Sequence, residues 1–415
     1  MVPGEIVQQS KTPKTGIVLS GGGMRGAYEV GVVLGIAEVL GRKATDPPMF
    51  QVLAGTSVGA INAAFFAANS HYGDHAATAL RDVWTGLTLK DHAHLRPFGL
   101  LRPPRAMRRF RDWFLDGRGS SLLDTSALED VVRRSVDWQK LHTNIDTGVI
   151  SALLIAALHV VSGRTTVFAE LSREADYAPS RDQRRAVRYV QIEADHVLAS
   201  AAIPLLFPTR RVGDQYYSDG GLRFNTPIAP AIRAGAERIV VISVMRERST
   251  SEADLVESMA APGRGRDLSP IFLVGKLLNA LLLDPVLYDL QVLERFNQLM
   301  SVLEQALPPE QLQRVQNVLA GNRGIGYRRL RTLIFTPSQD LGKLAGRYLR
   351  TSLKLTDLNP FVKYALQRAA SDDPAQEADW ASYLLFDGGF AAELIEIGRS
   401  DAHAKAAEIR SFFQE

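Results

Sequence analysis

Residues 53–65 read LAGTSVGAINAAF and place a serine between two glycines, at the point where an apolar strand runs into a helix. Gly55, Ser57 and Gly59 form the pattern Gly-x-Ser-x-Gly. In a strand-turn-helix context the serine is forced into a strained turn, and the glycines avoid collisions across it. The hydroxyl then projects at the N-terminus of the next helix, which favours developing negative charge. The stretch therefore predicts a nucleophile, with an N-cap serine in an ordinary tight turn as the alternative.

A second glycine-rich turn, GGGMRG at residues 21–26, follows the apolar run IVL at residues 17–19. It also fits Gly-x-Gly-x-x-Gly, the fingerprint of dinucleotide binding. That fingerprint requires an acidic residue at the end of the second strand to bind the ribose. Here the second strand ends in Gly-Thr-Ser, while Glu38 and Asp46 fall in a helix and a loop. We therefore expect no cofactor, and we interpret the turn as backbone amides directed at an oxyanion.

The serine needs a base, and Asp-Gly-Gly at residues 219–221 offers a carboxylate on a loop after the apolar QYY. The same tripeptide begins at Asp387, but there it lies between two helical patterns and is typical of a helix N-cap. A Ser-Asp-His triad in the order of the α/β-hydrolases would need a histidine after the aspartate. Only His403 follows residue 219, on a polar helix face, and His196 is a weaker alternative.

Strand and helix patterns alternate twice between residues 15 and 70, which indicates an α/β fold with a mainly parallel sheet. A charged segment containing glycine and proline follows residue 245 and marks a boundary. We predict a disordered lead-in at residues 1–14, a catalytic α/β domain at residues 15–245, and a mainly helical region at residues 246–415 with a lid, membrane-facing or packing role. Further strand candidates are GVISALLIAAL, TTVFAEL, VRYVQI, RIVVISV and RTLIFTP.

The bulk composition excludes several classes of site. The chain has no cysteine, which excludes disulfides, thiolate metal sites and cysteine nucleophiles. Its net charge of +3 is too small to imply a nucleic-acid partner. His92 and His94 have no further ligand cluster beside them, so no metal is expected. The longest apolar run, residues 271–283, is shorter than the roughly 20 residues that cross a bilayer. The amino terminus lacks the apolar core of a secretory signal. We therefore expect neither a transmembrane helix nor a signal peptide.

One segment, residues 96–118, mixes arginines with aromatic side chains and few acidic residues. Such a segment suits docking on anionic lipid headgroups. The alternative is a solvated, partly packed connecting helix. The candidate membrane-binding residues are Arg105, Arg108, Arg109, Phe110, Arg111 and Trp113.

Taken in order, GGGMRG, GTSVG and DGG resemble the motifs of the patatin-like phospholipases, and ASAAIPLLFP at residues 199–208 is similar to the family's segment before the aspartate. The resemblance covers about residues 15–245. It implies a patatin-like three-layer α/β/α core, with Ser57 as nucleophile and Asp219 as base in a dyad without histidine. It also implies an oxyanion hole in the glycine-rich turn, with Arg25 helping to place that turn. The turn comprises Gly21, Gly22, Gly23, Met24, Arg25 and Gly26.

The resemblance further implies a hydrolase that cleaves carboxylic esters of phospholipids or lysophospholipids through an acyl-enzyme on Ser57. A serine acyltransferase and a non-catalytic lipid-binding module are the alternatives. The first normally needs a histidine beside the serine and a carboxylate-binding arginine, and neither is evident. An aspartate with an ordinary pKa of about 3.9 is a poor base for a hydroxyl, so the site must raise that pKa or stabilise the alkoxide strongly.

Several properties stay open on the sequence alone: the acyl position that is cut, the preferred headgroup, the need for an activator and the oligomeric state. We expect a bacterial protein that is cytoplasmic or peripheral to a membrane.

Overall fold

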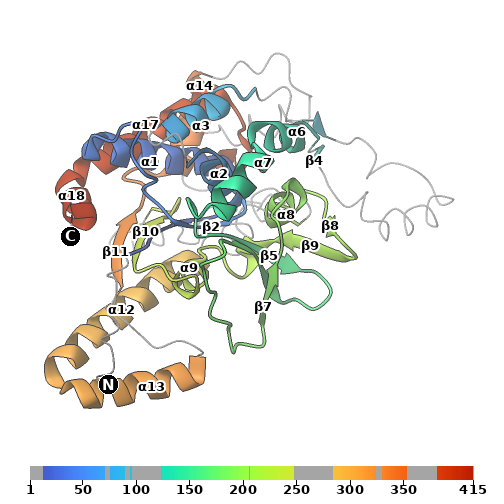
Figure 1. The fold of residues 1–415 in the computed structure, drawn as a ribbon. Helices are drawn as coiled ribbons and strands as arrows, with labels where there is room; N and C mark the ends of the chain where they lie inside the picture. The colour runs from blue at the N-terminus through green and yellow to red at the C-terminus, as the bar shows by residue number, and fades with distance from the viewer. Residues whose placement is uncertain are drawn as a thin grey trace, which may run out of the picture.

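The chain forms a central sheet between two helical layers (Figure 1). The computed structural model describes residues 13–70, 75–88, 94–95, 123–124, 126–204, 206–246, 284–323, 330–352 and 381–414. Within these residues the main sheet has nine strands, and a separate small sheet pairs β3 (His94–Leu95) with β4 (Leu123–Asp124). The main strands are β1 (Thr15–Leu19), β2 (Val52–Thr56), β5 (Ala152–His159), β6 (Thr165–Leu171), β7 (Arg185–Tyr189), β8 (Arg210–Val212), β9 (Gln215–Asp219), β10 (Arg238–Ile242) and β11 (Arg331–Phe335).

The strand order is β11-β10-β1-β2-β5-β6-β7. Neighbouring strands are parallel from β11 through to β5, antiparallel between β5 and β6, and parallel again between β6 and β7. The β8-β9 hairpin joins the sheet through antiparallel pairing of β9 with β5. The mainly parallel sheet expected from the sequence is confirmed.

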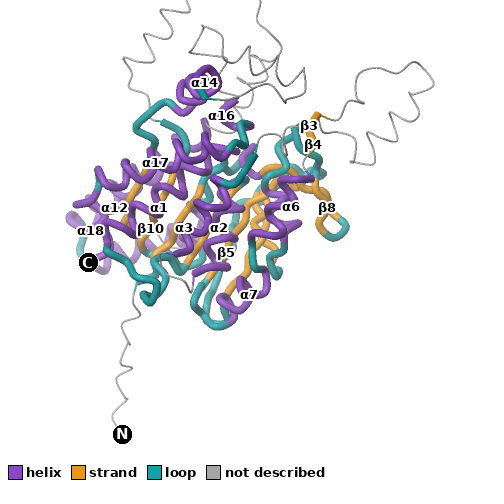
Figure 2. The backbone as a smooth tube through the Cα atoms, turned by 90° about the horizontal axis from the view of Figure 1, so that it is seen from above, coloured by secondary structure: helices purple, strands orange, loops and turns teal. Residues whose placement is uncertain are grey.

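Helices cover both faces of the sheet. On one face, α17, α1, α3 and α2 lie side by side across the strands, as Figure 2 shows. The other face is covered by α9 and by the start of a long helical hairpin formed by α12 and α13. The helices are α1 (Gly26–Leu40), α2 (Val58–Asn69), α3 (His75–Thr85), α6 (Ser126–Ser135), α7 (Trp138–Asp146), α8 (Ala194–Ser200), α9 (Ile228–Arg233), α12 (Asp284–Ala306), α13 (Pro309–Arg323), α14 (Leu341–Thr351), α16 (Ala381–Leu384), α17 (Gly388–Ala404) and α18 (Ala406–Gln414), with short 3-10 turns η1 (Gly23–Arg25) and η3 (Gly220–Leu222).

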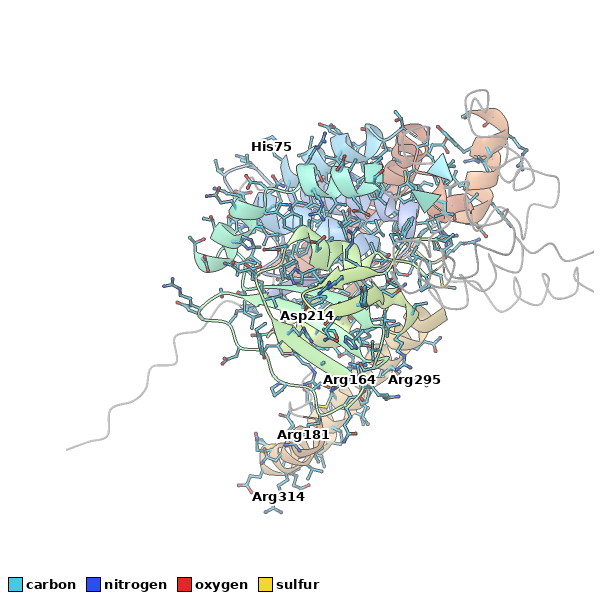
Figure 3. The ribbon with its side chains drawn as sticks, turned by 90° about the vertical axis from the view of Figure 1, so that its right-hand side faces the viewer. His75, Arg164, Arg181, Asp214, Arg295 and Arg314 are labelled. Atoms are coloured by element: carbon cyan, nitrogen blue, oxygen red, sulfur yellow. The ribbon has the colours of Figure 1, made fainter. Side chains whose placement is uncertain are left out.

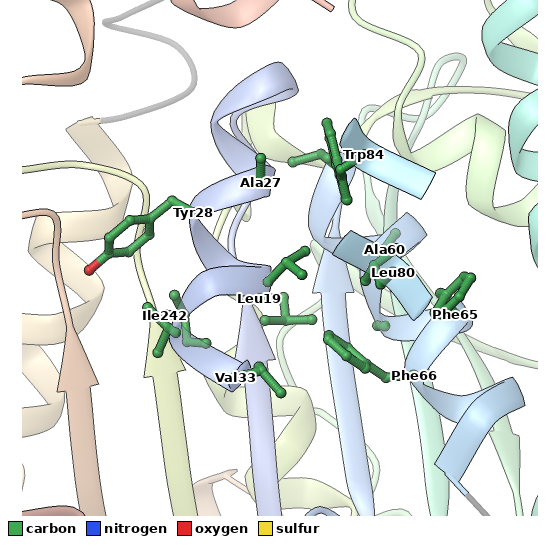
Figure 4. Close-up of a cluster of buried hydrophobic side chains, with 14 of the residues drawn as sticks. Leu19, Ala27, Tyr28, Val33, Ala60, Phe65, Phe66, Leu80, Trp84 and Ile242 are labelled. Carbon is green, nitrogen blue, oxygen red and sulfur yellow. The ribbon is translucent and has the colours of Figure 1, made fainter. Parts of the chain in front are cut away.

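The side chains of β1 explain why two helical layers are needed. Ile17 and Leu19 join the core under α1 and α2, whereas Val18 joins the core under α9. Because successive side chains of a strand point to opposite faces, a fully apolar strand is buried only between two layers. Figure 4 shows the larger core, in which Leu19 and Ile242 meet side chains of α1, α2 and α3.

The region after residue 245 completes this core. Strand β11 extends the sheet beside β10, and α17 packs along α1. The glycines of α1 allow this close approach, since a Cβ at Gly31 would collide with the carbonyl oxygen of Ile395. In the described chain this region therefore packs against the α/β core, and the sheet continues past residue 245 into β11.

Each strand candidate overlaps a strand of the main sheet, whereas β8, β9 and the two short strands β3 and β4 were not expected. Asp219, expected on a loop, is the last residue of β9. None of the helices in the described chain is both long and apolar enough to cross a bilayer.

Candidate active site

The pairing of β5 brings the ends of two strands together. β2 runs parallel to β5 and ends with Thr56 opposite Ala156. β9 runs antiparallel to β5 and ends with Asp219 opposite Ala157. Because β6 occupies the other side of β5, β2 and β9 share one side and meet end to end. Ser57, the residue after β2, therefore lies beside the carboxyl of Asp219.

Ser57 occupies a strained turn between β2 and α2. Its φ of 56° and ψ of −126° make it the one non-glycine residue with positive φ in the described chain. Such a conformation costs about 1–3 kcal/mol and is typical of functional sites. The hydroxyl makes no capping hydrogen bond to α2. Ser57 is thus the N-cap residue of α2 by position, but its hydroxyl does not cap the helix and lies beside the carboxyl of Asp219 instead.

The glycines around Ser57 are required by close backbone contacts. A Cβ at Gly55 would collide with the carbonyl oxygen of Gly59, and a Cβ at Gly59 would collide with that of Leu19. A Cβ at Gly26 would lie 2.5 Å from Val58 Cγ2. Hence the first turns of α1 and α2 sit directly against each other and against β1.

Asp219 is completely buried. Its Oδ1 accepts a hydrogen bond of 2.7 Å from the backbone N–H of Gly221. Burial raises the pKa of Asp219 to about 7, while the Ser57 hydroxyl and the Gly221 amide act in the opposite direction because they stabilise the carboxylate. Oδ2 is buried and has no hydrogen-bond partner in the described chain. The contact with Ser57 is thus looser than a strict hydrogen bond, as catalytic contacts often are before substrate tightens them.

The glycine-rich turn lies against Ser57 and is held by Asn225. The N–H of Gly21 donates to Asn225 Oδ1 at 3.0 Å, and Asn225 Nδ2 donates to Gly21 O at 3.2 Å. A Cβ at Gly21 would lie 3.0 Å from the Cβ of Ser57. The N–H groups of residues 22–24 have no acceptor among the described residues. They can therefore donate to an oxyanion formed next to Ser57.

Arg25 connects this turn to the C-terminal region. Its Nε donates to Ser382 Oγ at 2.8 Å, and its guanidinium carbon lies 4.3 Å from the ring centroid of Tyr383. Gly23 has a φ of 57°, and a Cβ there would collide with Tyr383 O. The segment that contains α16 therefore forms one wall of the turn.

A buried carboxyl, Glu29, lies in the first turn of α1. Burial raises its pKa well above the ordinary value, against hydrogen bonds that lower it. Asn62 Nδ2 donates to Glu29 Oε2 at 2.8 Å and to Gly26 O at 3.0 Å, while Asn62 Oδ1 accepts from Trp84 Nε1 at 3.1 Å. This network ties α1 to α2 and α3.

Residues 17–232, more than half of the chain, match the family model described as Patatin-like phospholipase. The chain belongs to the patatin-like phospholipase family. Membership of this family suggests a lipid acyl hydrolase. A search of curated protein sequences finds no match.

Two solved structures show distant similarity to this patatin-like phospholipase. One is the crystal structure of VipD from Legionella pneumophila, with 11% identity, a TM-score of 0.34, and coverage of 96% of this chain and 67% of that chain. The other is human GIVD cytosolic phospholipase A2 in complex with methyl gamma-linolenyl fluorophosphonate, with 12% identity, a TM-score of 0.34, and coverage of 97% of this chain and 59% of that chain. The chain thus spans less than two thirds of the human enzyme's length.

Two further residues hold the site of this patatin-like phospholipase. The N–H of Ser57 donates to Ser200 Oγ at 2.8 Å, and Ser200 Oγ donates to Ala156 O at 2.6 Å. Ser200 belongs to ASAAIPLLFP, so the sequence marked its segment but not its contact. Asn225 follows the Asp-Gly-Gly loop, and no sequence pattern marked it. Both residues act on backbone groups, which explains why motif reasoning missed them.

Asp387, the aspartate of the second Asp-Gly-Gly, is the N-cap of α17 as the sequence predicted. Its Oδ1 accepts from the backbone N–H groups of Gly389 at 3.0 Å and Phe390 at 3.3 Å. The hydroxyl of Tyr348 donates to the same oxygen at 2.5 Å. These contacts leave Asp387 in a structural role.

The two histidine alternatives lie in other interactions. His403 is exposed, and its Nε2 lies 2.6 Å from Glu38 Oε2. His196 is buried in α8, where its Nδ1 accepts from the N–H of Glu193 at 3.0 Å. In the described chain neither ring is paired with Ser57 or Asp219.

Some sequence expectations cannot be placed. His92 and the candidate membrane-binding residues lie outside the described residues; the latter are Arg105, Arg108, Arg109, Phe110, Arg111 and Trp113. Across the described ranges there is no group of three or more potential metal ligands.

Proposed function

We propose that this protein cleaves carboxylic ester bonds of phospholipids or lysophospholipids through an acyl-enzyme on Ser57, with Asp219 as the base. The observation that carries the proposal is the strained serine beside a buried carboxyl whose pKa is raised to about 7. A base is most effective when its pKa lies near the working pH. Membership of a phospholipase family supports lipid esters as the substrate class.

The first half of the reaction transfers the acyl group. The Oγ of Ser57 attacks the ester carbonyl carbon while its proton moves to Asp219, whose Oδ2 has no other partner in the described chain. The carbonyl oxygen becomes an oxyanion, to which the N–H groups of residues 22–24 donate. The tetrahedral intermediate then collapses: the bond to the alcohol oxygen breaks, and that oxygen takes the proton from Asp219. The alcohol leaves, and the acyl group stays on Ser57.

The second half releases the fatty acid. A water molecule attacks the acyl carbon and gives its proton to Asp219, and the same N–H groups stabilise the second oxyanion. Collapse breaks the bond to Ser57 Oγ, which recovers its proton from Asp219. The N–H of Ser57 stays bound to Ser200 throughout and is therefore not an oxyanion donor in this scheme.

The test is release of fatty acid from mixed phospholipid and lysophospholipid vesicles. We expect Ser57→Ala and Asp219→Asn each to lower kcat by at least about a thousandfold, as losses of nucleophile and base do in serine hydrolases. Asp387→Asn is the matched control. Asparagine caps helices as well as aspartate does, so this variant should retain wild-type activity.

Full activity of Asp219→Asn would overturn the dyad. Transfer of the acyl chain to an added alcohol or thiol, with little free fatty acid, would instead assign the protein to the acyltransferases. A wild-type chain that binds lipid but releases nothing, with every variant equal to it, would favour a binding module.

A further inference from the structure

The turn between β5 and β6 carries exposed apolar side chains. Val161 is 81% exposed and Val160 is 44% exposed, and neighbouring Tyr216 on β9 is 37% exposed. The N–H of Val160 donates to Tyr216 O at 2.9 Å, which places the turn and β9 side by side. Clustered apolar side chains that serve no core indicate a surface covered by a partner.

Hydrogen bonds of the backbone and of the His159 ring hold this turn. The N–H of His159 donates to Arg164 O at 2.9 Å. The ring of His159 lies 2.8 Å from Ser162 Oγ through Nδ1 and 2.8 Å from Gln215 Oε1 through Nε2. These hydrogen bonds support the turn conformation in which the two valines are exposed.

Two basic side chains lie in or beside this turn. Arg164 and Arg223 are exposed, and Arg223 Nη2 lies 3.8 Å from the position of a Cβ on Gly163 in the turn. Within the described ranges neither guanidinium is paired with a carboxylate. The neighbouring carboxylates of Asp182 and Asp214 are already paired with other arginines. The apolar tip is thus flanked by unneutralised positive charge.

This surface lies close to the proposed dyad. Tyr216 precedes Asp219 by three residues on β9. Val160, the first residue after β5, follows Ala157, the pairing partner of Asp219, by three residues. At the rise of a strand these steps are about 10 Å. In Figure 1 the turn projects from the same side of the molecule as β8 and β9. Figure 3 views that side and labels Arg164 and Asp214 on it.

We propose that Val160, Val161, Arg164, Tyr216 and Arg223 form a docking lip for an anionic phospholipid bilayer. The valines enter the boundary between headgroups and acyl chains, where apolar side chains bury about 5–10 Å deep. The arginines bind lipid phosphates, which the positive charge of the lip matches. The proposal rests on the proposed function for its choice of partner, since a lipid ester has to reach Ser57 from a membrane.

The test measures binding of the full chain to vesicles by co-sedimentation. All chains carry Ser57→Ala, so that the vesicles stay intact and binding is measured apart from hydrolysis. On vesicles of equal parts phosphatidylcholine and phosphatidylglycerol, Val161→Asp should lower partitioning roughly tenfold or more, because a charged group replaces an inserted side chain. Arg164→Gln should lower it roughly fivefold on these vesicles and leave it unchanged on pure phosphatidylcholine.

The matched control is Val318→Asp on α13, where a valine is also highly exposed, at 64%. This variant should bind within about twofold of the parent, as surface substitutions usually do. Circular dichroism and the unfolding midpoint establish that Val161→Asp is folded. The lip is overturned if Val161→Asp binds like the parent or if both valine variants lose binding equally.

A protein that fails to release fatty acid in the earlier assay would overturn the proposed function. If that protein still bound vesicles and Val161→Asp selectively lost this binding, the docking-lip proposal would stand although the proposed function had failed.

Discussion

At the level of single residues, the site combines a strained backbone with a desolvated carboxyl. The positive φ of Ser57 projects its hydroxyl from the end of β2, and burial brings the pKa of Asp219 to about 7. A raised pKa and strong oxyanion donors are the two ways in which an aspartate can serve as a base for a hydroxyl. Burial supplies the raised pKa, and the amides of residues 22–24, which lie in the turn next to Ser57, are the donors that we propose for the oxyanion.

The pH dependence of hydrolysis should report the pKa of Asp219. Only the carboxylate form can accept the serine proton, so kcat/KM should rise with pH, by about tenfold per unit on the acid side, and level off above pH about 7. The measurement is kcat/KM on a soluble ester between pH 5 and 9. A profile that levels off near pH 4 would show that Asp219 keeps an ordinary pKa.

The same pKa also affects folding stability. The folded chain keeps the proton of Asp219 up to pH about 7, whereas the unfolded chain loses it near pH about 4. The stabilising contribution of the protonated carboxyl is therefore complete below pH about 4 and is lost as the pH rises to about 7. Asparagine at position 219 does not titrate. As the pH rises through this window, the Tm of Asp219→Asn should therefore increase relative to the Tm of the wild type, and above the window the difference should stay constant.

Ser200 should act as a positioning residue. Ser200→Ala leaves the buried N–H of Ser57 without an acceptor, which costs about 1–3 kcal/mol. We expect kcat to fall roughly tenfold or more while KM changes little, because the nucleophile is misplaced and the binding surface is not. The control is Ser218→Ala: Ser218 is also buried and also donates to a backbone carbonyl, that of Ala202, at 2.8 Å, but it does not bond to Ser57. Equal losses in both variants would contradict this role.

At the level of elements, glycines set the distances between helices and strands. Gly59 brings α2 against β1, Gly26 brings α1 against α2, and Gly31 brings α1 against α17. The contact between Gly31 and α17 includes no proposed catalytic residue. It nevertheless fixes the position of α1, the helix that follows the glycine-rich turn. Packing of α1 therefore positions the turn as directly as the turn's own sequence does.

Gly31→Ala tests this packing. Alanine raises helix propensity by about 1 kcal/mol, but its Cβ meets the backbone of Ile395, which cannot rotate away. We expect a net loss of roughly 1–3 kcal/mol, as for other overpacked sites, measured by chemical denaturation. Gly86→Ala is the control, since its nearest atom would lie 3.2 Å away and the position is exposed. Stabilisation by Gly31→Ala would mean that propensity outweighs packing there.

At the level of the whole molecule, the described residues after position 245 belong to the same core as the proposed dyad. They supply the edge strand β11, the partner helix α17 and the wall against the oxyanion turn. The side chain of Arg25 donates a hydrogen bond to Ser382, so residues from before and after position 245 meet at the glycine-rich turn.

A chain that ends at residue 245 should consequently fail to form the native core. It would expose the ladder of β10 and the face of α1 that packs on α17, surfaces that are completely buried at Ile242 and Val32 in the full chain. We expect no cooperative thermal transition, a flat near-ultraviolet circular dichroism spectrum and no hydrolysis of a soluble ester. Cooperative unfolding together with activity in the shortened chain would show that residues 15–245 form an independent domain.

The local sequence determined most strands of the main sheet, the glycine-rich turns and the N-cap role of Asp387, because strand periodicity, tight turns and capping depend on residues close together in the chain. The order of motifs also pointed to Ser57 and Asp219 as a pair. Only the tertiary structure decided how that pair meets, through the end-to-end arrangement of β2 and β9 on one side of β5. It likewise decided the burial of Asp219 and the hydrogen bonds of Ser200 and Asn225 to the backbone of Ser57 and Gly21. It also decided that β11 joins the sheet and that α17 packs on α1. Burial and long-range hydrogen bonds depend on which distant segments pack together, and no local pattern records them.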